Sequence, residues 1–407
     1  MGYFRQAIKG VSWMGALRVS TRAIAFVKIA ILARLLTPEQ FGIFGVAAIV
    51  LAFLEILTET GVNIFFIQEE GKLKDYLNTA WVVSIVRGIL ISLVLLLGAP
   101  IIASFFKSPE AKSLILFIAI VPFIKGFINP AIVKYQKELK FNKEFLLRFC
   151  TFFVDALVAV LFALVTKEAV SLIWGFIAGG ILEVVLSFII FKPTPRLTFE
   201  YDKLKRVINR GKWITGAGVF KYFFEQGDDI VVGRLLNTNF LGLYQMAYKI
   251  STLPITEVAE VFVKVTFPVY VKISEDTKRL KRAFLKTTAT VTLLVMPIGL
   301  ILFFFPTEVI LFVLGQNWLP AVPVLKILSI FGTISAISNS SHSLFIAVKK
   351  QEYVTAITFV SIFAMALFII PLVGAYGIVG AGIAATIGLV ASLPFTIYYS
   401  WKVISKP

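Results

Sequence analysis

The sequence has little cysteine, histidine and charge. It contains one cysteine, Cys150, and one histidine, His342, in 407 residues, so a disulfide framework and a thiol metal site are excluded. Charged residues make up only 15% of the chain, and the acidic ones are the scarcer kind, 23 against 40 basic. This composition excludes a soluble globular protein, and we expect no metal and no cofactor.

Apolar residues are abundant. Hydrophobic side chains make up 58% of the chain, the mean hydropathy is +0.89, and several apolar runs reach the roughly 20 residues that a membrane-spanning helix needs. A net charge of +17 would suggest nucleic acid as a partner in a soluble chain, but here cytoplasmic loops explain it. We predict an all-α polytopic protein of the cell membrane, embedded in the lipid bilayer and without a nucleic-acid partner. The first span is expected to be retained, because no cleavage site follows a short apolar core.

Twelve transmembrane helices are predicted from the apolar runs. They cover residues 12–36, 41–67, 79–105, 113–133, 145–165, 170–191, 213–236, 241–270, 283–305, 322–348, 354–373 and 377–403. Proline interrupts several of them, and each such position is either a hinge or a static bend.

Lysine and arginine between the spans predict the orientation. If the N-terminus is cytoplasmic, the large basic groups at residues 134–148, 192–212 and 272–286 all lie inside. The outside connections then hold only Lys107, Lys112 and Lys167. We therefore place both termini in the cytoplasm.

The chain repeats itself at an offset of 200 residues. ARLL at residues 33–36 matches GRLL at residues 233–236, and Trp13, Gly42 and Ala47 recur as Trp213, Gly242 and Ala247. We predict an N-terminal six-helix lobe at residues 1–191, a basic cytoplasmic linker at 192–212 and a C-terminal six-helix lobe at 213–407. An even number of spans per lobe makes the repeat parallel, an arrangement that suits alternating access.

Residues 33–47, ARLLTPEQFGIFGVA, carry a family resemblance. With the basic helix before them and a Gly61-Val-Asn pattern after them, they resemble the polysaccharide-biosynthesis flippases of the multidrug/oligosaccharidyl-lipid/polysaccharide exporter superfamily. The branch they resemble is that of the lipopolysaccharide and teichuronic-acid exporters. The resemblance implies a transporter and not an enzyme, one that moves a polyprenyl-diphosphate-linked, anionic glycan from the inner to the outer leaflet. A glycosyltransferase and a polymerase are the partners it suggests.

Positive side chains inside the predicted spans are the candidate substrate contacts. Arg18 and Arg22 lie on one face of the first span, where a charge near the membrane centre costs ~2.5–3.5 kcal/mol and normally faces protein or water. Guanidinium groups bind phosphate oxygens in pairs, so we expect both arginines to bind the diphosphate. Lys28, Arg87 and Lys125 are further candidates. The alternative is that these cations pair with carboxylates of neighbouring helices.

Carboxylates inside the spans are candidates for charge pairing or ion coupling. Glu55 and Glu59 share a face of the second span and are the nearest in sequence to neutralise the first helix. In the seventh span, one face carries a lysine and three carboxylates, Lys221, Glu225, Asp228 and Asp229. Such a surplus needs protons, a bound cation or cations of another helix, so pairing and coupling to H⁺ or Na⁺ both stay open.

Three further polar positions and three other functions are weighed. Asp155 and Glu183 are expected to face the bundle interior, and His342 belongs to a polar stripe that we assign to helix packing before a proton relay. A drug or cation antiporter would need an anionic cavity, whereas the first lobe is cationic. An enzyme acting on lipid-linked glycans would need catalytic groups on a large outside loop, and the outside loops are short. A non-transporting membrane scaffold is the third alternative.

Overall fold

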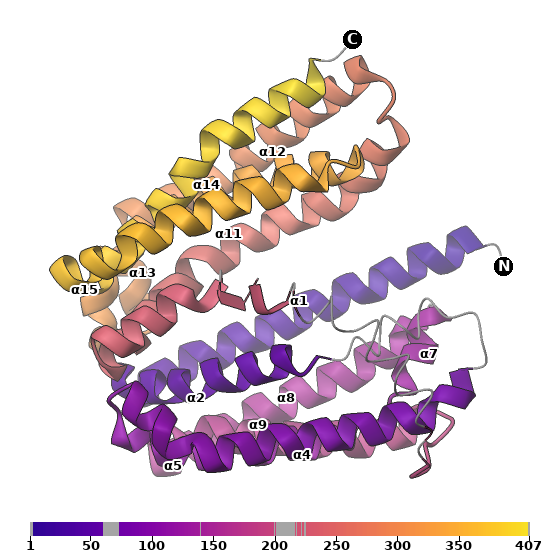
Figure 1. The fold of residues 1–407 in the computed structure, drawn as a ribbon, viewed down its shortest axis with the longest axis vertical. Helices are drawn as coiled ribbons and strands as arrows, with labels where there is room; N and C mark the ends of the chain where they lie inside the picture. Colours follow the sequence, from indigo (N-terminus) through magenta and orange to yellow (C-terminus); the bar gives the residue numbers. More distant parts are fainter. Residues whose placement is uncertain are drawn as a thin grey trace. The chain divides into compact units, whose positions relative to one another are not determined.

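The computed structural model describes residues 3–59, 73–138, 140–198, 200, 216, 218–220, 222–223 and 225–405. Every regular element in these ranges is a helix (Figure 1), and seven of them are long and apolar enough to cross a membrane by length and composition. The all-α class is confirmed. The chain divides into two compact units, residues 1–227 and 228–407, and each is described by itself.

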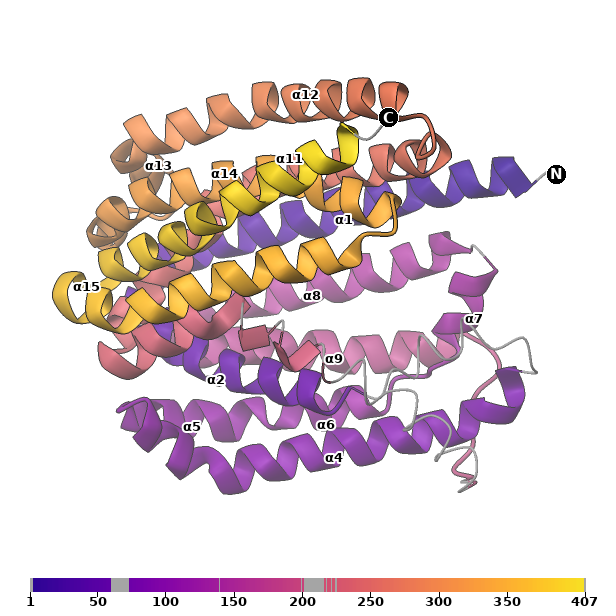
Figure 2. The same cartoon turned by 45° about the horizontal axis from the view of Figure 1, so that its top comes forward.

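The first unit is a bundle of helices of unequal length. It contains α1 (Tyr3–Leu35), α2 (Pro38–Leu57), α4 (Leu73–Phe105), α5 (Pro109–Ile118), α6 (Ile120–Gly126), α7 (Ile132–Lys137), α8 (Phe141–Thr166) and α9 (Val170–Ile190). α1 packs along α8, and α8 along α9 (Figure 2). On the other side, α4 packs on α5 and α6, and α9 contacts both of these short helices. α5 and α6 therefore join the two groups.

The predicted fourth span, residues 113–133, is not a single helix. α5 and α6 are separated at Ala119, close to Pro122, which lacks the N–H that a continuous helix would need. The hydroxyl of Ser92 on α4 donates to the Ala119 carbonyl at 2.7 Å. After α6, the fully buried Asn129 donates to carbonyl groups that follow α9 and accepts from the N–H of Ala131. Polar groups at the break are thus satisfied inside the protein, as a broken membrane helix requires.

Two helices begin in the same way 200 residues apart. α2 follows Thr37, whose hydroxyl accepts from the Gln40 N–H at 3.3 Å, while the Gln40 side chain accepts from the Thr37 N–H at 2.9 Å. α11 (Thr238–Lys272) follows Asn237, whose side chain accepts from the Phe240 N–H at 3.0 Å. These caps satisfy N–H groups that the first helical turn leaves free. The helix break of each half therefore occurs at the same position of the offset.

The second unit is built around one central helix. Residues 228–235 are helical, and α11, α12 (Thr277–Phe304), α13 (Pro306–Val313), the 3₁₀-helix η1 (Gln316–Ala321), α14 (Val322–Ala347) and α15 (Gln351–Ile404) follow. α14 contacts each of the other five elements named here. It therefore forms the core of this unit.

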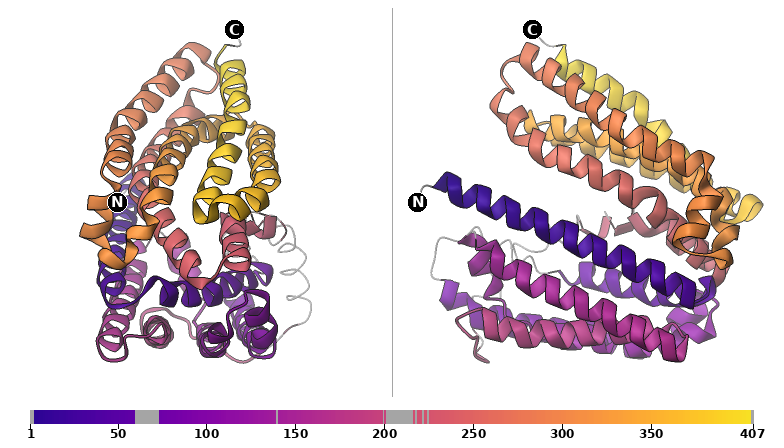
Figure 3. Two further views of the ribbon diagram at one scale, coloured as in Figure 1. Left: turned by 90° about the vertical axis from the view of Figure 1, so that its left-hand side faces the viewer. Right: turned by 180° about the vertical axis from the view of Figure 1, so that it is seen from behind.

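α15 is a helical hairpin and not a straight rod. At Gly377 the backbone has φ +59° and ψ −137°, and the chain reverses there, as the yellow end of the ribbon shows (Figures 1 and 3). The rings of Tyr353 and Tyr399, near the two ends of α15, stack at 4.2 Å with an interplanar angle of 6°. The two limbs correspond to the predicted spans 354–373 and 377–403. A positive φ costs glycine little, which suits it to the turn.

Some predictions fall outside the described residues. The end of the second predicted span lies beyond residue 59, and residues 201–215 include most of the expected linker. The predicted domain limits at 191 and 213 stay predictions.

Candidate functional site

α1 is a long basic helix. Its 33 residues include no acidic one and six basic ones, namely Arg5, Lys9, Arg18, Arg22, Lys28 and Arg34. The helix packs on α8, and Leu17 and Leu32 are among its buried positions. Of the two predicted phosphate ligands, Arg18 is half-buried and Arg22 is exposed, and both interact with neighbouring groups. One helical turn separates them, so they share a face.

Lys28 is held by a carboxylate of α8. Its side chain is 8% exposed, and its ammonium group donates to both oxygens of Asp155, at 2.8 and 2.9 Å. The same nitrogen lies 5.1 Å from the ring centroid of Phe176 on α9, and an aromatic face attracts a cation. The structure therefore gives Lys28 the carboxylate partner that was the alternative to a substrate contact. Asp155 lies inside the bundle, as predicted.

Glycine on α9 permits this arrangement. A Cβ atom at Gly175 would lie 2.6 Å from the Asp155 carbonyl oxygen and 2.5 Å from its Oδ1, and one at Gly179 would lie 3.2 Å from the Thr151 carbonyl oxygen. Small residues let helix backbones approach closely in membranes. Gly175 therefore brings α9 against the part of α8 that carries Asp155.

Arg87 on α4 binds the end of α2. Its Nε donates to the Thr58 hydroxyl at 3.0 Å, and its Nη2 donates to the carbonyl oxygen of Glu55. Thr58 is the last residue at the C-terminal end of α2. The carboxylates of Glu55 and Glu59 interact electrostatically with this guanidinium. The structure thus brings the two predicted glutamates to Arg87, while their pairing with the cations of α1 stays a prediction.

A second ion pair links α8 and α9. Arg148 donates to Glu183 at 2.8 Å, with side-chain exposures of 40% and 9%. Sequence reasoning counted Arg148 among the loop cations and missed this role. The available signal was Glu183, because a carboxylate buried in a bundle needs a partner. Lys125, by contrast, is exposed on the short helix α6.

The second unit holds an acidic pair on a hydrogen-bonded support. Asp228 is 5% exposed, and it accepts from the Tyr244 hydroxyl at 2.6 Å and from the Asp229 N–H at 3.0 Å. Tyr244 is completely buried on α11. Asp229 accepts from the Gln245 side chain at 3.0 Å, and Lys249, one turn further along α11, attracts it. Tyr244 and Gln245 had not been predicted.

The other two members of this predicted face are less defined. Glu225 is exposed, and Lys221 lies outside the described residues. Within the described part of the chain, no group of three or more His, Cys, Asp and Glu residues is placed to hold a metal ion. Coupling to H⁺ or Na⁺ stays a prediction.

Buried charges of opposite sign occupy equivalent positions of the two halves. Lys28 and Asp228 are 200 residues apart, and both are buried. At the position equivalent to Tyr244 the first half has Phe44, whose ring lies 5.6 Å from that of Phe176, the residue beneath Lys28. Each half therefore surrounds its charge with suitable groups, an aromatic face for the ammonium and a hydroxyl donor for the carboxylate. Alignment of the two halves was the signal that sequence reasoning could have used.

Comparison with known proteins places the chain among proteins of surface-polymer synthesis. Residues 31–323 match the family described as "Polysaccharide biosynthesis protein". The lipopolysaccharide biosynthesis protein WzxC of Escherichia coli is 26% identical over 423 residues, covering 100% of this chain and 82% of that protein. The teichuronic acid biosynthesis protein TuaB of Bacillus subtilis is 24% identical, covering 86% and 72%. Among solved structures, the lipid II flippase MurJ in an inward closed conformation matches with a TM-score of 0.76 and 15% identity, covering 95% and 86%. The chain therefore has this fold.

Proposed function

The chain belongs to the polysaccharide biosynthesis protein family, and on that basis we propose that it is a flippase of the cell membrane. Its substrate is an oligosaccharide linked to a polyprenyl diphosphate, a precursor of a surface polysaccharide, which moves from the inner to the outer leaflet. Two relatives named for the synthesis of lipopolysaccharide and teichuronic acid support this substrate class, and a fold shared with a lipid flippase supports the mode of action. A glycosyltransferase supplies the substrate and a polymerase consumes it.

The proposed layout is twelve transmembrane helices in two six-helix lobes, related by a parallel repeat, with both termini in the cytoplasm. Three observations support it: helix caps at Thr37 and Asn237 that share the 200-residue offset, the hairpin of α15, and buried charges at Lys28 and Asp228. Such a repeat suits rocking of the lobes around a fixed binding position.

The observation that carries the proposal is the charge of α1. A helix of 33 residues with six cations and no carboxylate offers a positive face to a diphosphate, and Lys28 is the cation for which the structure shows a carboxylate partner on α8. Arg18 and Arg22 bind the diphosphate, while the polyprenyl chain stays in lipid beside the protein. Arg87 and Lys125 extend the positive surface. Their field matters most in the membrane interior, where water screens it little.

The membrane potential drives release to the outside. Each elementary charge that crosses the membrane is worth ~2.3 kcal/mol per 100 mV, so two phosphate charges gain roughly 4–5 kcal/mol on moving away from the negative interior. Asp228 and Asp229 are the positions at which a counter-moving H⁺ or Na⁺ would bind.

Reconstitution tests the two arginines. Wild type and the double variant Arg18→Gln, Arg22→Gln are placed in vesicles with a fluorescent polyprenyl-diphosphate glycan, and transfer between leaflets is followed by a membrane-impermeant quencher. We expect the double variant to lose most of the transfer. Arg22→Lys keeps the charge but not the paired donors, so we expect an intermediate rate.

Arg34→Gln is the matched control, because Arg34 lies on the same helix at its end and is exposed. It removes the same charge, and transfer at close to the wild-type rate is expected. Wild-type transfer by the double variant, or equal losses in the control, would show that the arginines do not bind the diphosphate.

A further inference from the structure

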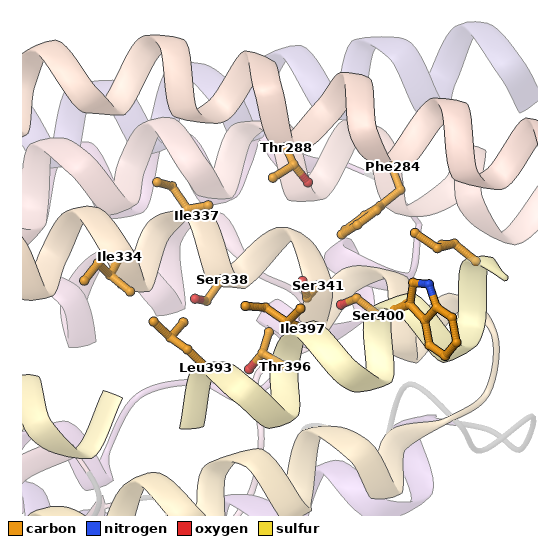
Figure 4. A pocket seen from close by; sticks show the side chains of 12 residues that line it. Phe284, Thr288, Ile334, Ile337, Ser338, Ser341, Leu393, Thr396, Ile397 and Ser400 are labelled. Carbon is orange, nitrogen blue, oxygen red and sulfur yellow. The ribbon is translucent and has the colours of Figure 1, made fainter. Parts of the chain in front are cut away.

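The second unit contains a cavity that the candidate site does not use. Its volume is about 480 Å³, and it lies between α12, α14 and the second limb of α15 (Figure 4). Small-molecule sites commonly measure about 300–1,000 Å³. Most of the wall is apolar, with Phe284 from α12 and Trp401 from α15 at one end. A row of hydroxyl groups, including Ser338 and Ser341 of α14, interrupts it.

Two hydroxyl groups of the cavity wall have no partner. The Oγ1 of Thr288 and the Oγ of Ser400 are buried, and among the described residues neither makes a hydrogen bond. Figure 4 shows them on two different helices beside the same space. Other hydroxyls of these helices donate to the carbonyl four residues earlier, as Thr292 and Thr396 do at 2.8 and 3.0 Å. An unsatisfied buried group costs about 1–3 kcal/mol, so the cavity favours a ligand with oxygen atoms.

One end of the cavity is strongly basic. α12 has no acidic residue, and its first ten residues include Lys278, Arg279, Lys281, Arg282 and Lys286, all exposed. Seven residues, about two turns, separate Lys281 from Thr288, so both lie on the same face of α12. Trp401, 62% exposed, lies in the last turn of α15 at the same end of the cavity. Tryptophan and lysine together are typical of the membrane interface.

We propose that this cavity binds an anionic phospholipid of the surrounding bilayer. One acyl chain fills the apolar part, the ester carbonyl oxygens accept hydrogen bonds from Thr288 and Ser400, and the phosphate lies at Lys281. A phospholipid carries oxygen atoms at two depths, as these residues require, whereas a polyprenyl diphosphate carries them only at its phosphate end. Basic pockets between membrane helices bind anionic headgroups in this way. Because the lipid contacts α12, α14 and α15 together, it stabilises this unit.

Bromine quenching of Trp401 tests the proposal. The full chain is placed in phosphatidylcholine vesicles with increasing amounts of phosphatidylglycerol that carries a dibrominated acyl chain, and the signal of a Trp401→Phe variant is subtracted. We expect quenching to saturate at a mole fraction about fivefold lower than with dibrominated phosphatidylcholine, which is the factor that about 1 kcal/mol for one lysine gives. Equal curves for the two lipids would show ordinary contact with the bilayer and overturn the proposal.

Three variants locate the site. Lys281→Gln is expected to abolish the preference for phosphatidylglycerol, whereas Lys286→Gln keeps it, because that residue lies about 200° around the helix from Thr288. Ser338→Leu fills the cavity and is expected to weaken quenching by both lipids. Equal effects of the two lysine variants would refute the headgroup position. Displacement of the brominated lipid by polyprenyl diphosphate at an equal mole fraction would assign the cavity to the transported lipid and overturn the proposal.

Discussion

Neutralising one or both members of the Lys28–Asp155 pair separates its structural role from a role in transport. Lys28→Met leaves the carboxylate of Asp155 buried without its cation, and Asp155→Asn leaves the ammonium group without its anion. The double variant removes both charges and preserves side-chain volume. Because the two side chains are only 9% and 15% exposed, water cannot replace the lost partner in either single variant.

The expected magnitude follows from the geometry. At 2.8 Å and an effective dielectric constant of about 20, the attraction between the charges is about 6 kcal/mol. Desolvation offsets much of this attraction, but loss of one partner from a buried pair still costs about 3–5 kcal/mol, while replacement of both is close to neutral. Each single variant should therefore be much less stable than the double variant.

Unfolding of the detergent-solubilised protein by increasing sodium dodecyl sulfate, followed by circular dichroism, measures these differences. The control is Lys112→Met, which removes an exposed lysine and should change the free energy of unfolding by less than about 0.5 kcal/mol. If the costs of the two single variants simply add in the double variant, the pair contributes no coupling and the reasoning is refuted.

Transport by the double variant then decides the role of Lys28. A helix-pairing role predicts that the double variant, once stable, moves the fluorescent glycan lipid at close to the wild-type rate. A substrate contact predicts that transport stays low although stability returns. The structure favours the first result, because the Lys28 ammonium already has a carboxylate and an aromatic face.

Two further predictions use the same unfolding assay. Gly175→Ala places a Cβ 2.6 Å from the Asp155 carbonyl oxygen and should cost about 1–3 kcal/mol through overpacking; Gly374→Ala, whose Cβ would meet nothing within 4 Å, should cost little, and equal costs would contradict the close approach. Tyr244→Phe removes the donor to the buried Asp228 and should cost about 1–3 kcal/mol. Tyr376→Phe, at a position 62% exposed, is its control, and an unchanged midpoint for Tyr244→Phe would refute a stabilising hydrogen bond.

The sequence predicted the fold best where local signals agreed. Apolar runs, the cap at Thr37 and the glycine at 377 each act within a few residues, so the helix starts and the α15 hairpin followed from them. The break between α5 and α6 did not, because the Ala119 carbonyl is stabilised there by Ser92, 27 residues earlier in the chain. Pro254 and Pro268, expected to interrupt a span, lie inside the continuous helix α11.

The family was predicted correctly from residues 33–47, which lie within the matched range 31–323. The partners of the charged residues were harder to predict. Lys28 and Asp155 are 127 residues apart, and hydrophobic periodicity gives no information about which helices are neighbours. The same limit applies to Arg148 and Glu183. Sequence reasoning found the buried charges because they are costly in a membrane, but only the packing of α1, α8 and α9 shows which of them pair.

The pairing of Lys28 changes which residues can attract a negatively charged substrate. An ammonium group 2.8 Å from a carboxylate forms a neutral pair, whose field falls off faster with distance than that of a single charge. It therefore adds little to the attraction of a diphosphate, whereas Arg18 and Arg22, on a helix without any acidic residue, add to it directly. Lys28 instead fixes α1 against α8, and this contact holds the helix that presents the arginines. The buried cation and the two arginines thus have separate tasks, one in packing and one in binding.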